Sequence, residues 1–264
     1  MEEVTRRVTI WQEREGERRE LEDTVVVEAP LTVFFNEREV VTLLCTPRHL
    51  DELAVGFLLS EGFLKERTRL EKVEVDGEEG RAVICYRGDS PVARETFLKR
   101  VITTGCGRGT SFYHLTDAFI RPVNETRVTV DGATILRLMR EAQKASELFL
   151  TTGGVHSAFL ANEKGIILLR EDIGRHNALD KIIGHCFLHG ISTADKMLLT
   201  TGRLTSEIIL KAARLGIPVV ISRSAPTAMA VELGGRLGIT LIGFVRGSRF
   251  NIYTHPFRVE GGQR

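Results

Sequence analysis

The stretch KMLLTTGRLTSEIILKAARLGIPVVIS, residues 196–222, decides the fold class. Its apolar run at 196–201 predicts a buried strand, the periodicity over 205–215 predicts a helix, and 218–222 predicts a second strand. Gly216 follows the helix at the place where glycine commonly ends one. A strand, a helix and a strand in this order form a parallel pair joined by a right-handed crossover. The stretch therefore predicts an α/β domain.

The segments on both sides of this unit continue the alternation of strands and helices. Two strands separated only by the polar residues 162–164 pair as a hairpin, so we expect the sheet to be mixed. The predicted elements are helices at 134–148, 177–189 and 226–237, the paired strands at 155–161 and 165–171, and strands at 239–245 and 251–254. These elements make 131–264 one α/β domain.

The first half of the chain alternates apolar and polar residues in the manner of strands. Strands are predicted at 6–11 and 18–27 around a charged tip at 12–17, at 31–36 and 39–45 after the break at Pro30, and at 73–75 and 81–86. A helix is predicted at 47–64, with Pro47 in its first turn. The segment 122–129 is the expected link, so that 1–130 forms a smaller N-terminal α+β domain.

Composition and charge exclude several classes of protein. The 264 residues carry 36 basic and 35 acidic side chains, and this balance favours neither nucleic acid nor an anionic membrane surface. No apolar run has the length of a signal peptide core or of a membrane-spanning helix, so a cytoplasmic protein is expected. The four cysteines form no C-x-x-C pair, and we expect Cys45, Cys85 and Cys186 to be core or near-core thiols.

The fourth cysteine stands in a different setting, the sequence TTGCGRG at 103–109. Cys106 lies among glycines, which remove the side chains that would bury it and allow other chains to approach. Arg108 supplies a cation that would lower the pKa of the thiol if the two side chains meet. The alternative is a small residue buried in a tight turn. The glycines favour an accessible, reactive thiol.

Four polar loops follow the predicted strands of the second half. They are 171–176, 200–203, 222–225 and 246–249, and each places arginine beside Gly, Ser or Thr. Ligand sites of such sheets lie beyond the carboxyl ends of the strands. Three of the loops precede helices, whose N-termini attract anions, and guanidinium groups bind phosphate. The loops predict a pocket for a phosphorylated ligand; the alternative is four solvated turns.

Two histidines lie next to these loops, and the sequence leaves their roles open. His156 and His176 are each either a structural residue or an acid or base, and Asp172 either orients an imidazole or meets a ligand hydroxyl. Zinc nucleobase deaminases share this order of elements, but they need a glutamate two residues after the histidine and a pair of cysteines. Here Ala158 stands at the glutamate position and no cysteine pair exists. No metal site is expected.

Ordered motifs along the chain resemble those of a known family. They are EAPL (28–31), DELAVGFL (51–58), TGCG (104–107), TGGVH (152–156), EDIGRHNA (171–178), SRSAP (222–226) and YTHP (253–256). Together they make the sequence, from about residue 27 to residue 256, resemble the FdhD/NarQ family of formate dehydrogenase accessory sulfurtransferases. The resemblance implies a three-layer, cytidine-deaminase-like domain with a mixed sheet and no deaminase zinc site. It also implies a cytoplasmic homodimer.

The function that this resemblance implies is sulfur transfer. Cys106 would take persulfide sulfur from a cysteine desulfurase. The sulfur would pass to the molybdenum (or tungsten) bis(molybdopterin guanine dinucleotide) cofactor before the cofactor enters formate dehydrogenase. The family's cofactor-binding position and the polar loops together give the expected contacts Phe244, Val245, Arg246, Gly247, Ser248, Arg249, Arg203, Arg223, Ser224 and His176. Some members carry a second cysteine where this chain has Gly109, so a relay through one cysteine is expected here.

Two other classes of function remain open from the residues. A non-catalytic chaperone would hold the pterin cofactor and dock to formate dehydrogenase without using Cys106. A hydrolase acting on nucleotides is the reading that fold analogy suggests, although fold alone is a poor guide to activity. Replacing Cys106 separates the carrier from the chaperone, and zinc content with nucleotide turnover tests the hydrolase.

Overall fold

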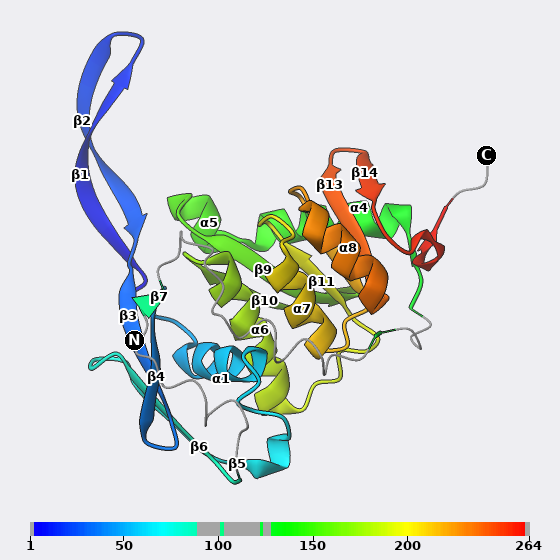
Figure 1. Ribbon diagram of the computed structural model, residues 1–264. Coiled ribbons are helices and arrows are strands. Elements are labelled where there is room, and N and C mark those ends of the chain that lie inside the picture. The colour runs from blue at the N-terminus through cyan, green and yellow to red at the C-terminus, as the bar shows by residue number, and fades with distance from the viewer. Residues whose placement is uncertain (1–2, 89–100, 103–121, 124–127, 262–264) are drawn as a thin grey trace.

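The computed structural model describes residues 3–88, 101–102, 122–123 and 128–261. In this part the chain is a mixed α/β protein whose strands form four sheets (Figure 1). The cysteine loop at 103–109 lies outside the described residues. Among the helices that are described, none has the length and apolar character needed to cross a membrane.

The second half of the chain is built on a six-stranded sheet. Its strands are β9 (His156–Asn162), β10 (Gly165–Asp172), β11 (Met197–Thr200), β12 (Val219–Ser222), β13 (Thr240–Arg246) and β14 (Arg249–Ile252). They lie in the order β10-β9-β11-β12-β13-β14. The β11, β12 and β13 strands are parallel, whereas β9 is antiparallel to both of its neighbours. The mixed sheet expected from the sequence is confirmed.

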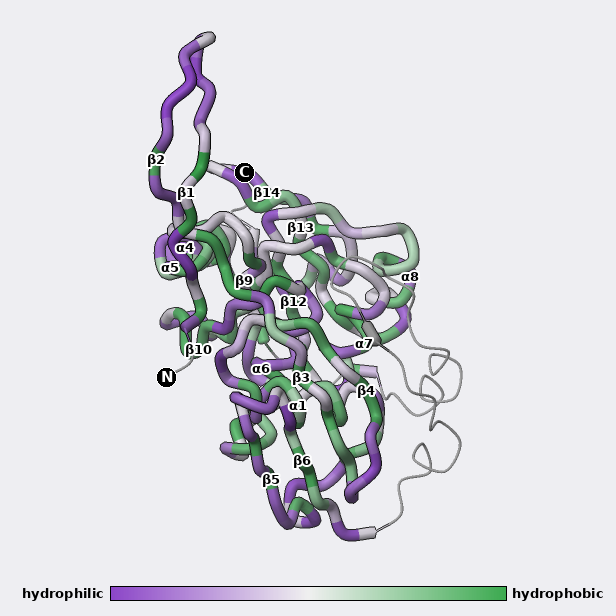
Figure 2. The backbone as a smooth tube through the Cα atoms, turned by 90° about the vertical axis from the view of Figure 1, so that its left-hand side faces the viewer, coloured by the Kyte–Doolittle hydropathy of each residue, from purple (hydrophilic) through white to green (hydrophobic). Residues whose placement is uncertain are grey.

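Helices cover both faces of this sheet, so this half of the chain has three layers (Figure 1). They are α4 (Gly132–Ala145), α5 (Glu147–Thr152), α6 (Arg175–His189), α7 (Ser206–Arg214) and α8 (Ala228–Leu237). Successive side chains of a strand point to opposite faces. Leu198 and Val220 accordingly pack with α6, α7 and α8, whereas Leu199 and Ile221 pack with α4. Figure 2 shows these strands as largely hydrophobic, as expected for a sheet covered on both faces.

The first half forms a five-stranded sheet covered by one helix. The strands β3 (Ala29–Phe35), β4 (Arg38–Cys45), β5 (Leu70–Asp76), β6 (Arg81–Tyr86) and β7 (Val101–Ile102) lie in the order β5-β6-β3-β4-β7, and α1 (Leu50–Ser60) packs on them. The short pieces η1 (Arg67–Arg69), η3 (Pro256–Arg258), β8 (Val130–Asp131) and β15 (Val259–Glu260) complete the described elements. β7 runs parallel to β4, with Leu43 opposite Ile102.

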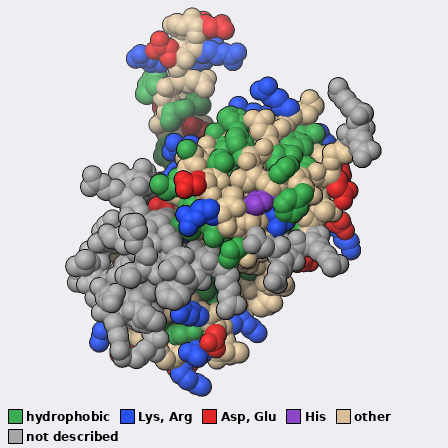
Figure 3. All heavy atoms as spheres, turned by 45° about the vertical axis from the view of Figure 1, so that its right-hand side comes forward, with side chains coloured by type: hydrophobic (Ala, Val, Ile, Leu, Met, Phe, Trp, Pro, Cys, Tyr) green, Lys and Arg blue, Asp and Glu red, His purple; other side chains and the backbone are tan. Residues whose placement is uncertain are grey.

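A long hairpin of β1 (Thr5–Arg14) and β2 (Glu17–Val26) projects from the body (Figure 1). The first strand is longer than predicted and the second begins one residue earlier, because the turn is confined to Glu15 and Gly16, which have φ of 56° and 84°. Figure 3 shows basic and acidic side chains together at its tip. Its base contacts the body, where Val26 lies against Gly154.

The two halves meet where α1 crosses α6. A β-carbon on Gly56 would lie 1.8 Å from Asp180 O, and one on Gly184 would lie 1.8 Å from Glu52 O. Only glycine allows the two backbones to approach this closely. The division of the chain into domains 1–130 and 131–264 stays a prediction.

Several element boundaries differ from those that the sequence predicts. The helix predicted at 47–64 begins at Leu50, because His49 takes a left-handed conformation with φ of 56°. The helix predicted at 134–148 ends at Ala145, because Ser146 has ψ of 70° and α5 begins after it. Pro30 does not interrupt the chain but lies inside β3, at a position where the neighbouring β6 has not yet begun to pair.

Candidate functional site

The four polar loops of the second half gather at one edge of the six-stranded sheet, as predicted. We call 171–176, 200–203, 222–225 and 246–249 the rim. The β10, β11, β12 and β13 strands run in one direction, so their carboxyl ends lie together. The β9 strand begins at the same edge, where His156 pairs with Asp172.

Hydrogen bonds join three loops of the rim to one another. Ser222 Oγ donates to Gly202 O (2.6 Å) and accepts from Ser224 N (2.9 Å). Phe244 N donates to Ser224 O (3.1 Å). Arg246 Nε donates to the carbonyl oxygen of Arg223 (3.2 Å). The structure therefore brings these predicted ligand residues together and holds their backbones in place.

The other predicted ligand contacts lie at β13 and β14, and they differ in whether their side chains are exposed to solvent. Arg246 and Arg249 are exposed, and the Arg246 guanidinium lies 5.7 Å from the centre of the Phe244 ring. Gly247 has φ of 58° and forms the turn between the strands with exposed Ser248. Val245 is only 1% exposed, and its side chain packs in the core next to α4. Val245 can therefore offer a ligand only its backbone.

Arginine side chains from two more loops are exposed at the rim. They are Arg203 and Arg223, and the Gln143 amide oxygen accepts hydrogen bonds from Arg223 Nη1 and Nε (both 3.2 Å). Gly202 fits closely against Arg175, because a β-carbon at Gly202 would lie 3.1 Å from Arg175 Cβ. Burial, and after it the charge of Arg203, lower the pKa of Arg175. Like charges held this close favour an anionic ligand between them.

The starts of α6 and α7 add buried polar atoms that lack hydrogen-bond partners among the described residues. They are Arg175 Nε and both ring nitrogens of His176 on α6, and Oγ1 of Thr205, the residue before α7. His176 Nε2 lies 3.0 Å from Glu207 Oε2, but the two groups lack the alignment of a hydrogen bond. Burial, followed by the charges of Lys211 and Arg175, lowers the pKa of His176 to about 3. Unpaired donors beside helix N-termini suit a phosphate or carboxylate ligand.

The neutral state of His176 makes stability depend on pH. In the unfolded chain the imidazole takes up a proton below about pH 6.5, whereas in the folded protein its pKa is about 3. This histidine therefore lowers the free energy of unfolding as pH falls from about 6.5 toward 3, by up to about 1.4 kcal/mol per pH unit. Urea unfolding of wild type and His176→Gln at several pH values measures the effect. The variant should lose less stability on acidification, and an identical pH dependence would contradict the assignment.

The end of β4 is bound directly to the rim. Thr46 N donates to Asp172 Oδ2 (3.1 Å), and Ile173 N donates to Thr46 Oγ1 (3.2 Å). Asn177 Nδ2 donates to Leu44 O (2.9 Å). Because β7 is parallel to β4, Ile102 ends at this same side of the molecule. The chain therefore enters the segment after residue 102 close to the rim, although Cys106 itself lies outside the described residues.

The remaining cysteines are not placed as nucleophiles. Cys45 and Cys186 are buried, as predicted, and burial raises the pKa of Cys186 to about 11. Cys85 is half-buried in β6, which agrees with the near-core position expected for it. Within the described ranges, no three His, Cys, Asp or Glu side chains form a group that could hold a metal ion.

Sequence reasoning does not predict Thr205 or Lys181 as site residues, and it indicates Arg175 only as the arginine of the loop 171–176. Lys181 is fully buried on α6, where it makes an ion pair with Asp172. One signal was available, because Lys181 falls between Leu179 and Ile182 on the apolar part of the helix. A lysine in such a position needs a buried partner.

Comparison with known proteins gives one consistent group. A sequence profile described as the FdhD/NarQ family matches residues 26–260. A protein of Bacillus subtilis named sulfur carrier protein FdhD is 42% identical over 251 residues, covering 95% of this chain and 96% of that protein. Its namesake in Bacillus pumilus is 45% identical over 256 residues, covering 97% and 98%. A crystal structure of a candidate formate dehydrogenase accessory protein from Desulfotalea psychrophila superposes with a TM-score of 0.79 at 28% identity, covering 98% of this chain and all of that one.

Proposed function

Because the chain belongs to the FdhD/NarQ family, we propose that it is a sulfur carrier that acts in the maturation of formate dehydrogenase. Relatives of the same length bear the name sulfur carrier protein. The carrier residue we propose is Cys106, the cysteine of the glycine-rich stretch. The chain would act as a sulfurtransferase with a persulfide intermediate.

Loading of Cys106 follows the chemistry of thiol–persulfide exchange. The Cys106 thiolate attacks the outer sulfur of a persulfide on a cysteine desulfurase. The sulfur–sulfur bond of the donor breaks, the donor cysteine leaves as a thiolate, and Cys106 becomes the persulfide. With Gly109 at the position of a second cysteine, no disulfide within this stretch takes part.

The acceptor we propose at the rim is the molybdenum or tungsten bis(molybdopterin guanine dinucleotide) cofactor, which is cargo rather than a resident group. Exposed Arg203, Arg223, Arg246 and Arg249 offer charge-assisted hydrogen bonds to its phosphates. Arg175 and His176 supply unpaired nitrogens next to them. The role of the rim residues is to bind and orient the cargo.

One observation supports delivery from Cys106 to this edge. β7 ends at Ile102, next to the end of β4, and Thr46 at the end of β4 is hydrogen-bonded to the rim residue Asp172. Cys106 follows Ile102 by four residues, which span at most about 14 Å when fully extended. We infer from this short spacing that the thiol can approach the part of the rim next to Asp172.

The proposal also includes the fold family, the partners, the location and the oligomeric state. The three layers around the mixed sheet suit a cytidine-deaminase-like domain, with an N-terminal α+β domain at 1–130. The other partners are a cysteine desulfurase and formate dehydrogenase, and the protein would act in the cytoplasm as a homodimer. These properties are what membership of the FdhD/NarQ family leads us to expect.

A second candidate function, a non-catalytic cofactor chaperone, is favoured by the rim itself. The exposed arginines and the unpaired nitrogens of the rim can bind a phosphorylated ligand without the help of a cysteine. If the chaperone function holds, Cys106→Ala matures formate dehydrogenase as wild type does, whereas loss of Arg246 abolishes maturation.

The carrier function is tested by loading sulfur from a cysteine desulfurase that acts on isotopically labelled cysteine. Labelled sulfur should appear on the wild-type chain in the peptide that contains Cys106, and Cys106→Ala should carry none. Cys85→Ser serves as the matched control, because Cys85 is the remaining cysteine that is not fully buried. It should load as wild type does. Absence of label on wild type, or retention of label in Cys106→Ala, overturns the proposal.

A further inference from the structure

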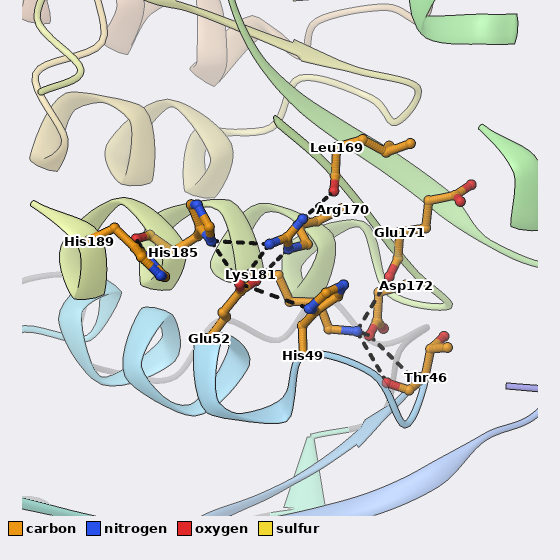
Figure 4. Close-up of polar contacts among 10 residues, drawn as sticks. All are labelled: Thr46, His49, Glu52, Leu169, Arg170, Glu171, Asp172, Lys181, His185 and His189. Atoms are coloured by element: carbon orange, nitrogen blue, oxygen red, sulfur yellow. Dashed lines mark hydrogen bonds and ion pairs between the residues drawn. The ribbon is translucent and has the colours of Figure 1, made fainter. Parts of the chain in front are cut away.

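Asp172 and Lys181 form a buried ion pair at the point where the two halves of the chain meet. Lys181 Nζ lies 2.6 Å from Asp172 Oδ2, and both side chains are 0% exposed. The lysine also donates to Thr46 O (3.1 Å) and Glu171 O (3.3 Å), so its three donors are all used. Figure 4 shows the ammonium group between the carboxylate and the Thr46 backbone.

The carboxylate of Asp172 also has several hydrogen-bond donors around it. It accepts hydrogen bonds from Thr46 N (3.1 Å), Gly174 N (2.9 Å) and Asn177 Nδ2 (2.9 Å). The same Asn177 group also donates to Leu44 O. We call Asp172, Asn177 and Lys181 the clamp, because together they hold both the N–H and the C=O of Thr46.

A buried ion pair is a poor device for stability alone. Removing two charges from water costs about as much as their attraction returns, and apolar side chains of similar volume often replace such a pair without loss. A satisfied buried polar network instead fixes one arrangement of the groups that it joins. Here the arrangement is that of β4 relative to the carboxyl end of β10.

The arrangement fixed by the clamp extends to the start of the segment that follows residue 102. Leu43 pairs with Ile102 in the parallel β4–β7 ladder. The clamp binds Leu44, the next residue of β4, and Thr46, which follows the strand. No contact of Asp172 or Lys181 involves the exposed arginines of the rim. The clamp thus acts on where the chain leaves β7, and not on the charge that would hold a phosphorylated ligand.

We propose that Asp172 and Lys181 are positioning residues for sulfur delivery: they fix the ends of β4 and β7 against the rim. This inference rests on the proposed carrier function. Loading by the desulfurase needs only an accessible thiol, so it does not depend on the clamp. Delivery needs the sulfur at a set distance from a ligand on the rim, and misplacement by about 1 Å lowers such rates up to about a hundredfold.

The test separates loading from delivery in the double variant Asp172→Asn/Lys181→Met, which removes both charges together. Labelled sulfur is first loaded by a desulfurase and counted. One portion of the loaded protein is treated with cyanide, which attacks the outer sulfur, so that the sulfur–sulfur bond breaks, Cys106 leaves as a thiolate and thiocyanate forms. The thiocyanate measures how much reactive persulfide is present, independently of any ligand at the rim. Delivery is measured as label transferred to the guanine dinucleotide pterin cofactor and as formate dehydrogenase activity. We expect normal loading, normal thiocyanate and delivery slowed at least about tenfold.

The matched control is Asp180→Asn/Lys211→Met. This pair is also buried and joins α6 to α7, with Lys211 Nζ 2.6 Å from Asp180 Oδ2, and it bonds to Ser60 Oγ rather than to β4. At about pH 8 His176 is neutral with or without the charge of Lys211, so the control should deliver sulfur at the wild-type rate once thermal stability is matched by the choice of temperature. Equal slowing in both double variants, or unchanged delivery in the clamp variant, overturns the inference.

Asn177→Ala is the milder variant to use if the double variant does not fold. It removes the bonds to Leu44 O and to Asp172 while the ion pair stays. Delivery should fall while thiocyanate release stays normal, and unchanged delivery counts against the clamp. Wild type that takes up no label would instead contradict the carrier function itself.

Discussion

Gly184→Ala should destabilise the protein by more than about 3 kcal/mol, which is at or beyond the usual cost of overpacking a core. A β-carbon at this position would lie 1.8 Å from Glu52 O and 2.6 Å from the carbonyl carbon of the same residue. Both atoms belong to the backbone of α1, so no side-chain rotation relieves the clash. The helices would have to separate, and the Glu52–Arg170 ion pair that joins α1 to β10 would be strained.

Gly56→Ala should have a similar effect from the other side of the crossing, where the β-carbon would meet Asp180 O at 1.8 Å. The control is Gly235→Ala in the interior of α8, where nothing lies within 4 Å of the added carbon. Alanine there should be neutral or should stabilise by up to about 1 kcal/mol, since it favours helix. Urea unfolding compares the three variants. A midpoint for Gly184→Ala equal to that of wild type would show that the helices do not pack in this way.

Removing two rim arginines should weaken guanosine diphosphate binding about a hundredfold or more. A hydrogen bond to a charged group contributes about 1.5–3 kcal/mol, and each 1.4 kcal/mol is a factor of ten in affinity. Arg223 and Arg246 are the residues to change, because both are exposed at the rim and the Arg246 side chain is held by the Arg223 carbonyl. Titration calorimetry with the diphosphate measures the loss for Arg223→Ala/Arg246→Ala.

Arg137→Ala is the matched control for this binding experiment. Arg137 Nη2 donates to Glu163 O in the turn between β9 and β10, at the sheet edge opposite the rim. Its loss should leave affinity unchanged. The rim would not be the ligand site if Arg137→Ala weakened binding as much as the rim variant, or if the rim variant bound with wild-type affinity.

Much of the six-stranded sheet could be predicted because its strands carry their own signal. Leu198, Leu199, Val220 and Ile221 are apolar on both faces of the sheet, which is typical of strands covered by helices on each side. Their common direction then placed the polar loops at one edge before any contact was known. The local hydrophobic pattern, together with the rule for where ligands bind in parallel sheets, was enough to predict both the sheet and the position of the polar loops.

The contacts between the two halves could not be predicted in this way. Thr46 and Asp172 are 126 residues apart in the sequence, and no periodicity links them. The left-handed conformation of His49, which delays the start of α1, also depends on its tertiary surroundings rather than on helix propensity. The sequence placed Arg175 in one of the four polar loops, but that its Nε is buried without a hydrogen-bond partner is seen only in the structure.

Glycines give the clearest example of this limit. Gly56 and Gly184 stand in the middle of helices, where the sequence shows only a residue of low helix propensity. The reason for each appears only when the opposite helix is in place. A sequence pattern therefore indicated the candidate site, whereas the contacts that hold the end of β4 against it are seen only in the packed structure.

The central claim is that sulfur held on Cys106 is delivered to a ligand bound at the rim. The most direct measurement is a single-turnover reaction of the chain carrying labelled persulfide with the guanine dinucleotide pterin cofactor. We expect label to leave Cys106 and appear on the cofactor with wild type, and to stay on Cys106 with Arg223→Ala/Arg246→Ala. Label that remains on wild-type Cys106 while the cofactor is bound, or transfer that proceeds equally without the rim arginines, would contradict the account.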